Sequence, residues 1–172
     1  MKKIYFVLSL VFLCAGLKNV NAQIAAWDFT GAAAPVTFAA TTFNANLVAA
    51  AGANNITRGP GAAASAGGNS FRTVGFQNNG IATTNTDYFQ ITLTAATGYT
   101  VSLSTIDARM AGTASYAAAP GVSQQFAYSL DGTNFTLIGA PSVTVGTPAT
   151  LTQIDVTGIG ALQNVAAGTT VT

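Results

Sequence analysis

The carboxylates are the chain's main source of acid–base chemistry, because the sequence has five aspartates, no glutamate and no histidine. Its one cysteine and all of its lysines lie within the first 18 residues. The remainder of the chain therefore lacks the groups needed for Ser-His-Asp triads, thiol catalysis, Schiff-base chemistry and HExxH zinc sites. Aspartate is the only candidate general base near neutral pH.

A pair of carboxylates could hydrolyse a glycosidic bond, since such enzymes place one acid on each side of it. The aspartates are spread along the chain, at Asp28, Asp87, Asp107, Asp131 and Asp155. Asp131 precedes Gly132 between two alternating runs and is better explained by a turn. We therefore expect no catalytic residues and a protein that is not an enzyme, with glycoside-active chemistry as the least favoured alternative.

Calcium is the one metal for which this composition offers suitable ligands, which are carboxylate, amide and backbone oxygens. No EF-hand spacing is present. Asp28, at the end of the first expected strand, is the single candidate ligand, and an ordinary surface aspartate is the alternative. No other cofactor is expected.

Two residues outside the aspartates are candidates for ligand binding. Tyr116 lies in an expected loop, where an exposed ring is a platform for sugars. Arg58, in the string Thr57-Arg58-Gly59-Pro60-Gly61, could donate two hydrogen bonds to a carboxylate or to sugar hydroxyls. The alternative for Arg58 is structural, with its guanidinium satisfying nearby backbone carbonyls. Trp27 lies in an apolar run and is expected in the core.

Residues 1–22 have the pattern of a cleavable secretory signal peptide. Lys2 and Lys3 precede an apolar run over residues 4–17, which is shorter than the roughly 20 residues that span a bilayer. Small side chains then lead to an expected cleavage site between Ala22 and Gln23. The sequence therefore predicts a secreted or cell-surface protein without a membrane span after cleavage.

Cleavage before Gln23 changes the formal net charge from +1 to −2, because three arginines then stand against five aspartates. Nucleic-acid binding is not expected, since neutralising phosphates requires clustered cations. The partners that remain are glycans or other surface proteins.

Alternation of apolar and polar residues, typical of half-buried strands, is the main pattern in residues 23–172. It is clearest over 87–94, 99–104 and 105–111, and the first two runs are expected to form a hairpin. In the third run Ile106, Ala108 and Met110 are expected to face inward. Asp131-Gly132 predicts another hairpin, between 125–130 and 133–138. Further strands are expected at 24–29, 71–75, 142–145 and 150–156.

No sustained helical period interrupts these short runs, so we predict a single all-β domain over 23–172, an antiparallel β-sandwich. Residues 45–70 are expected to form a long surface loop, with a short strand near 55–57. One helical turn is expected at 160–165. Residues 168–172 have the pattern of an opening strand, so the domain is expected to be incomplete at its C-terminus.

Four strings together resemble a recurrent jelly-roll-like domain of secreted bacterial surface proteins, often followed by a PEP-CTERM or type IX secretion sorting segment. They are Trp27-Asp28-Phe29-Thr30-Gly31, Thr57-Arg58-Gly59-Pro60-Gly61, Asp87-Tyr88-Phe89-Gln90-Ile91-Thr92-Leu93 and Tyr128-Ser129-Leu130-Asp131-Gly132. The resemblance implies a jelly-roll-like module of unassigned biochemical function and supplies no catalytic residues.

Two functions remain as hypotheses. The first is a non-catalytic structural or adhesive domain of the cell surface, which the low charge and the Thr- and Asn-rich strands favour. The alternative is a carbohydrate-binding module that presents aromatic side chains on its loops.

Overall fold

The computed structural model describes residues 23–33, 35–77, 79–112 and 121–172. The expected signal peptide, including Ala22, lies outside the described residues, and so does Tyr116. Gln23 is described and exposed.

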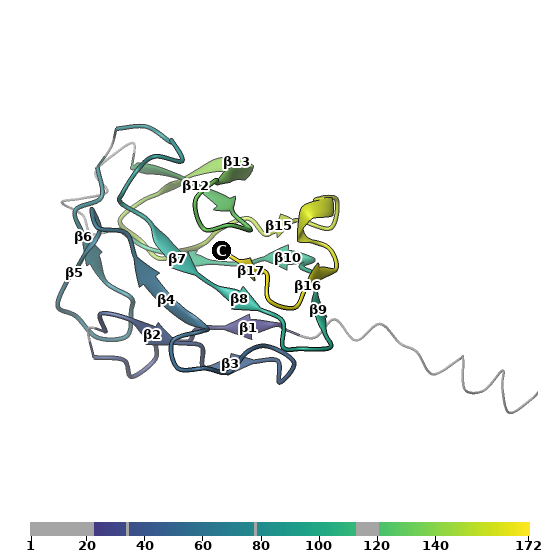
Figure 1. Ribbon diagram of the computed structural model, residues 1–172. Coiled ribbons are helices and arrows are strands. Elements are labelled where there is room, and N and C mark those ends of the chain that lie inside the picture. The colour runs from purple at the N-terminus through teal and green to yellow at the C-terminus, as the bar shows by residue number, and fades with distance from the viewer. Residues whose placement is uncertain (1–22, 34, 78, 113–120) are drawn as a thin grey trace, which may run out of the picture.

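The described chain is almost entirely β, with short strands and one 3-10 turn (Figure 1). The elements are β1 (Ala25–Ala26), β2 (Phe38–Ala39), β3 (Thr42–Phe43), β4 (Asn55–Arg58), β5 (Ala63–Ala64), β6 (Thr73–Val74), β7 (Phe89–Ile91), β8 (Leu93–Thr94), β9 (Thr100–Val101), β10 (Thr105–Ile106), β11 (Arg109–Met110), β12 (Val122–Tyr128), β13 (Thr136–Thr144), β14 (Ala149–Thr150), β15 (Ile154–Asp155), η1 (Gly160–Leu162), β16 (Val165–Ala166) and β17 (Thr170–Val171).

One set of strands is built around β4, which pairs antiparallel with β2 on one side and with β7 on the other. The chain continues past β7 into β8, which pairs with β17 near the C-terminus. Leu47 forms a bridge with Ala95, so the segment before β4 also lies against the end of β8. Residues far apart in sequence thereby meet in one sheet region (Figure 1).

A second set is one long antiparallel ladder in three pairs: β9 with β16, β10 with β15 and β11 with β14. Backbone hydrogen bonds join these pairs, for example from the Leu103 N–H to the Leu162 carbonyl and from the Val156 N–H to the Ser104 carbonyl. The expected inward residues of this ladder, Ile106, Ala108 and Met110, are each more buried than the exposed Asp107 and Arg109 between them.

The hairpin β12–β13 is the longest paired element. The register shifts between Gln124 and Phe126, where the β13 strand carries extra residues around Gly139. This bulge joins two expected strands, 133–138 and 142–145, into one. The hairpin predicted from Asp131-Gly132 is confirmed, with a longer loop than a two-residue turn, since Tyr128 pairs with Thr136.

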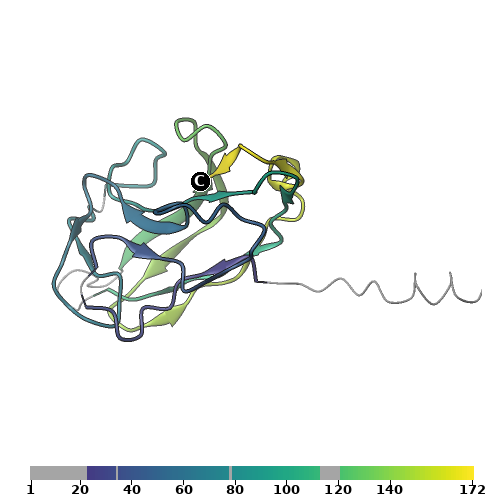
Figure 2. The ribbon, with the colours of Figure 1, turned by 60° about the horizontal axis from the view of Figure 1, so that its bottom comes forward.

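Figure 2 shows the same ribbon from a second direction, and two clusters of apolar side chains form the core between its strands. One cluster joins residues of the ladder, the β12–β13 hairpin and β17, with Val156 and Leu162 at its centre. A second cluster packs Leu47, Leu93 and Ala95 against Val101 of the ladder, with Trp27 at its edge. The predicted all-β, antiparallel, sandwich-like fold is confirmed.

One expectation about local structure is wrong, and another is confirmed only in its strand near 55–57, which is β4. Residues 87–94 and 99–104 do not form a hairpin with each other, because β8 pairs with β17 and β9 pairs with β16. The turn between them is present, with the Tyr99 N–H donating to the Ala96 carbonyl, but it carries the chain from one set of strands to the other. The strand expected near 55–57 within residues 45–70 is β4, but it is the middle strand of its sheet rather than part of a surface loop, and β5 follows it.

Two smaller expectations are confirmed. The turn expected at 160–165 is the 3-10 helix η1, whose Leu162 is fully buried. The strand expected at the C-terminus is β17, which pairs with β8. Val171 pairs with Leu93, and Thr172 exchanges two backbone hydrogen bonds with Ser129.

Candidate functional site

The Arg58 guanidinium donates hydrogen bonds to two other segments of the chain. Its Nε donates to Thr73 Oγ1 at 2.7 Å, and its Nη2 donates to the Arg72 carbonyl at 2.8 Å. Its Nη1 donates to the carbonyl oxygens of Pro35 and Val36. Burial lowers the pKa of Arg58, but an arginine remains charged at any physiological pH. These four hydrogen bonds favour a structural role, although their acceptors lie on residues 35–36 and 72–73 and not around Gly59 and Gly61 as the structural alternative had it.

Arg58 also covers an aromatic cluster. Its Cζ lies 3.5 Å from the centroid of the Phe71 ring, within the range of a cation–π contact. The Phe71 ring packs in turn on Phe29 and Phe89, each with ring centroids 5.7 Å apart. Gly59 follows Arg58 because a Cβ at that position would lie 2.2 Å from the Thr86 carbonyl oxygen.

Asp28 is exposed and makes a local turn. Its Oδ1 accepts hydrogen bonds from the Thr30 backbone N–H at 3.0 Å and from the Thr30 hydroxyl at 2.8 Å. These bonds lower the pKa of Asp28 below its ordinary value. Within the described residues, no three side chains of His, Cys, Asp or Glu gather as metal ligands.

The other aspartates also accept hydrogen bonds from the chain itself. Asp131 accepts the most hydrogen bonds of these aspartates. Its carboxylate accepts from the Asn134 side chain, from the backbone N–H groups of Asn134 and Thr133, and from the Ser129 hydroxyl. These donors, led by the Asn134 side chain, hold the pKa of Asp131 well below its usual range. The Thr157 hydroxyl and backbone N–H lower the pKa of Asp155 in the same way.

The two remaining carboxylates, on Asp87 and Asp107, each have a glutamine as donor. The Gln77 backbone N–H donates to Asp87 at 2.7 Å, and the Gln153 side-chain amide donates to Asp107 at 2.9 Å. A general acid or base at neutral pH needs a pKa near the working pH. Asp28, Asp131 and Asp155, whose pKa values are lowered by hydrogen bonds within the chain, are poorly suited to that task.

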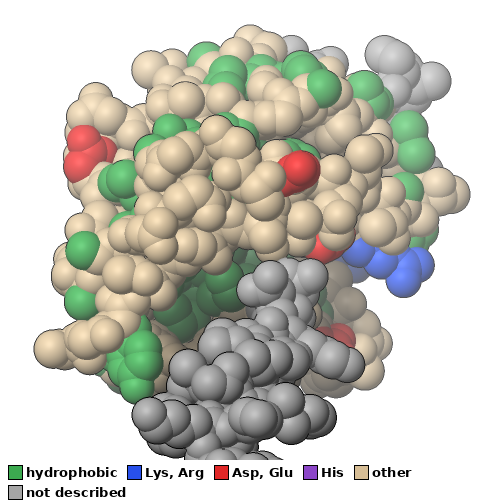
Figure 3. All heavy atoms as spheres, turned by 90° about the vertical axis from the view of Figure 1, so that its right-hand side faces the viewer, with side chains coloured by type: hydrophobic (Ala, Val, Ile, Leu, Met, Phe, Trp, Pro, Cys, Tyr) green, Lys and Arg blue, Asp and Glu red, His purple; other side chains and the backbone are tan. Residues whose placement is uncertain are grey.

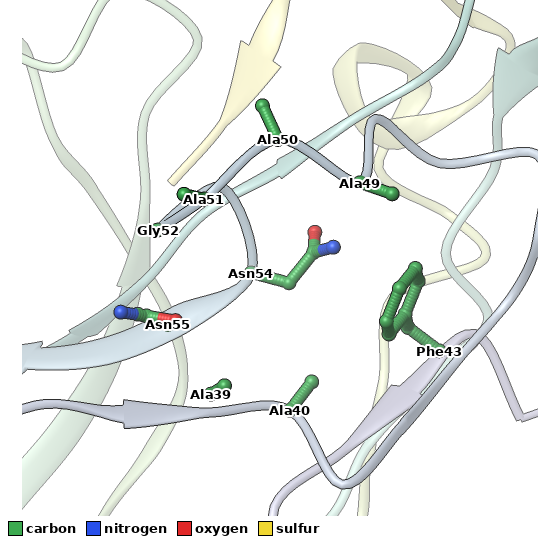
Figure 4. A pocket seen from close by; sticks show the side chains of 9 residues that line it. All are labelled: Ala39, Ala40, Phe43, Ala49, Ala50, Ala51, Gly52, Asn54 and Asn55. Carbon is green, nitrogen blue, oxygen red and sulfur yellow. The ribbon is translucent and has the colours of Figure 1, made fainter.

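A shallow hollow, which we call the Asn54 hollow, lies beside β3 and β4 (Figure 4). Its volume is about 180 Å³. It is lined by Ala39, Ala40, Phe43, Ala49, Ala50, Ala51, Gly52, Asn54 and Asn55. The lining side chains are therefore small and uncharged, apart from one aromatic ring and two amides.

Asn54 is the polar centre of this hollow. Its side chain extends toward Phe43 and the Ala49–Ala50 segment (Figure 4), and the residue is only 7% exposed. The side-chain Nδ2 donates to the Val48 carbonyl at 3.0 Å. The Oδ1 is buried, and no described group donates to it. Buried polar atoms normally have a partner, so this acceptor needs an explanation.

The backbone around Asn54 is held firmly. Its carbonyl accepts hydrogen bonds from the Trp27 indole Nε1 at 2.9 Å and from the Ala40 N–H at 3.0 Å. Trp27 packs against the second core cluster, as the sequence predicted. Phe43, by contrast, is 41% exposed at the side of the hollow.

Asn54 and Phe43 were not found from the sequence. The hollow forms because β2 and β3 lie beside the turn that precedes β4. No pattern in the sequence predicts that these segments are close in space. The one usable signal was Asn54-Asn55, a polar pair directly before a strand.

Comparison of the chain with family models, with curated proteins and with solved structures finds no match. In the described ranges, no helix has the length and apolar character needed to cross a bilayer.

Proposed function

We propose that the protein is a secreted, non-catalytic β-sandwich domain that acts as a structural or adhesive element of a bacterial cell surface. The observation that carries this proposal is the state of the aspartates. All five carboxylates accept hydrogen bonds from neighbouring groups of the same chain, and three have a lowered pKa. The proposed localisation rests on the signal-peptide pattern of residues 1–22, and the proposed bacterial context and jelly-roll-like family rest on the resemblance of four strings.

The surface supports the same proposal. The face seen in Figure 3 carries few charged side chains, and apolar side chains are scattered among uncharged polar ones. Leu137, Val143 and Val145, on or next to β13, are all exposed. Exposed apolar groups along one hairpin favour packing against another protein surface.

The test is self-association of residues 23–172 in sedimentation velocity, compared with the double variant Val143→Thr and Val145→Thr. Threonine keeps the shape of valine but has a hydroxyl in place of one methyl group, so the fold is retained and the apolar contact is weakened. We expect concentration-dependent association that the double variant loses. The matched control is Val36→Thr with Val74→Thr, which changes exposed valines away from β13. A monomer at every concentration, with no retention on other surface proteins, would contradict the proposal.

Carbohydrate binding is the second candidate, favoured by exposed aromatic rings. Tyr88 and Tyr99 are both exposed, and Phe43 borders the Asn54 hollow. A glycan array probed with residues 23–172 tests this function, with Tyr116→Ala, Tyr99→Ala and Phe43→Ala as variants. Binding to a glycan that one of these variants removes would support carbohydrate binding. No binding to any of a diverse set of glycans would contradict it, and the structural role would then be the remaining candidate.

A further inference from the structure

The connection from β6 to β7 (Figure 1) contains Asn79-Gly80, the one Asn-Gly dipeptide of the sequence. Both residues are exposed, and a Cβ at Gly80 would have nothing within 4 Å. Among the described residues, no group bonds to the Asn79 carboxamide, and none accepts a hydrogen bond from the Gly80 N–H. These are the two groups that react with each other when an asparagine deamidates.

Glycine is the residue that hinders this reaction least. It has no Cβ, so its nitrogen can approach the Cγ of the preceding asparagine closely, and its backbone turns readily into the geometry required. The Gly80 nitrogen loses its proton to water and bonds to Asn79 Cγ, and the Cγ–Nδ2 bond breaks to release ammonia. Water then opens the cyclic imide at one of its two carbonyls, which leaves aspartate or isoaspartate at position 79. Water is the only co-reactant.

The dipeptide Asp131-Gly132 could form the same cyclic imide, but both of its reacting groups are held. The Gly132 N–H donates to Ser129 Oγ at 2.9 Å. The Asp131 carboxylate accepts hydrogen bonds from the backbone N–H groups of Thr133 and Asn134, which keep it ionised and therefore a poor electrophile. In the folded protein this second site is protected.

Asn69, which also precedes a small residue, is held as well. Its Oδ1 accepts a hydrogen bond from the Gly31 N–H at 2.7 Å, and its own N–H donates to the Ala32 carbonyl at 2.9 Å. To react, the Asn69 side chain would first have to break its bond to Gly31, which adds to the barrier. The fold therefore leaves Asn79 as the reactive asparagine.

We propose that Asn79 is a modification site, at which the folded protein deamidates spontaneously through a cyclic imide formed with Gly80. The product has a sixth carboxylate against three arginines, so the formal net charge of residues 23–172 changes from −2 to −3. Isoaspartate also lengthens the backbone by one carbon, in a loop where the Gly80 carbonyl accepts a hydrogen bond from Asn85 Nδ2 at 2.7 Å. The modification therefore changes both the charge and the path of the β6–β7 connection.

The experiment incubates residues 23–172 at physiological temperature for several days, at acidic, neutral and mildly alkaline pH. Tandem mass spectrometry of the digested protein then assigns each modified residue. We expect Asn79 to gain about 1 Da in ordinary water and about 3 Da in H₂¹⁸O, because the amide nitrogen is replaced by one oxygen from the solvent. The rate should rise with pH, since the deprotonated Gly80 nitrogen is the nucleophile. Asn69 should react at least about tenfold more slowly.

Two variants and one change of conditions serve as controls. Asn79→Gln should abolish the mass gain, because its longer side chain closes a less favourable ring, whereas Asn46→Gln, at another exposed asparagine, should leave it unchanged. Unfolding in guanidinium chloride should raise ¹⁸O uptake at Asp131 at least about tenfold while changing the rate at Asn79 by less than about threefold. Circular dichroism confirms that both variants are folded.

Three results would overturn the inference. The first is an Asn79 that keeps its mass in the folded protein and reacts only in denaturant. The second is equal rates at Asn69 and Asn79, since the hydrogen bonds of Asn69 would then protect nothing. The third is a mass gain that persists in Asn79→Gln, which would place the reaction at another residue.

Discussion

At the scale of the residue, Arg58 connects two segments that the sequence separates. Its guanidinium donates to Pro35 and Val36 on one side and to Arg72 and Thr73 on the other, while lying on the Phe71 ring. Hydrogen bonds to both segments require the planar guanidinium with its several fixed N–H donors. The ammonium group of lysine is a single point charge and cannot make the same set of bonds.

Arg58→Lys should therefore lower the free energy of unfolding by about 1–3 kcal/mol, because several charge-assisted hydrogen bonds to partly exposed acceptors are lost. Denaturant unfolding at neutral pH measures the change. Arg109→Lys, at an exposed position of β11, is the control and should stay within about 0.5 kcal/mol of the wild type. Equal effects of the two substitutions would contradict the structural role of Arg58.

The lowered pKa of Asp131 leads to a prediction about how the stability of the fold depends on pH. Its pKa is lowered in the folded protein, so its carboxylate stabilises the fold at any pH above the unfolded value of about 3.9. That contribution is lost as the pH falls through the lowered folded pKa. Asn134→Ala removes the largest cause of the lowering while leaving the backbone N–H in place.

We expect Asn134→Ala to raise the pKa of Asp131 toward its ordinary value in a ¹³C NMR titration, with the pKa of Asp155 unchanged. The variant should have a lower melting temperature than the wild type at neutral pH. The difference should shrink below about pH 4, where the wild type loses its own contribution. A difference that stays constant down to pH 2 would show that Asn134 acts by another route.

At the scale of the element, Gly139 explains how the β12–β13 hairpin stays regular through its bulge. Its φ is +66°, a left-handed conformation that glycine adopts readily. A Cβ there would also lie 2.7 Å from Cδ1 of Ile154, a core-packed residue of β15. The glycine therefore allows both the bulge and the close approach of the ladder.

Gly139→Ala and Gly132→Ala separate these two roles. Gly132 has a φ of +71°, but a Cβ there would meet nothing within 4 Å. Both variants should be destabilised by about 1–2 kcal/mol from the left-handed backbone. Gly139→Ala should lose about 0.5–1.5 kcal/mol more, since Ile154 must leave its rotamer. Chemical denaturation compares the free energies of unfolding of the two variants. Equal decreases would mean that the Ile154 side chain moves away from the added Cβ at no cost in free energy.

The elements also show what sequence patterns can predict. Alternation placed Ile106, Ala108 and Met110 on the buried side of their strand, and Asp131-Gly132 marked a real hairpin. Alternation does not encode the partner of a strand, however. The predicted hairpin of 87–94 with 99–104 is wrong because β8 pairs with β17, which lies more than 70 residues away in sequence. The Asn54 hollow was missed for the same reason, since it exists only where separate segments meet.

At the scale of the whole molecule, β17 joins parts of the chain that are otherwise far apart. It pairs with β8, Thr172 pairs with Ser129 after β12, and Val171 belongs to the larger core cluster. Val171 is 5% exposed, and its neighbours come from the ladder and from the hairpin. The stability of the domain should therefore depend on this short strand.

Val171→Ala should lower the free energy of unfolding by about 1–3 kcal/mol, because two buried methyl groups are removed and a cavity remains. Val143→Ala is the matched control, since Val143 is 52% exposed and should change stability by less than about 0.5 kcal/mol. Guanidinium chloride unfolding at equal protein concentration measures both. A small effect at Val171 would mean that β17 contributes little to the core.

The hydrogen bond from the Trp27 indole to the Asn54 carbonyl has an optical consequence. Trp27 is the only tryptophan of the sequence, so red-edge excitation gives fluorescence from one ring alone. Its Nε1 donates to the backbone of the residue whose side chain forms the hollow. Indole emission depends on the hydrogen bond and polarity at that nitrogen, so the protein carries an intrinsic, label-free reporter beside the hollow. An intensity or wavelength change on ligand addition would follow occupancy in real time.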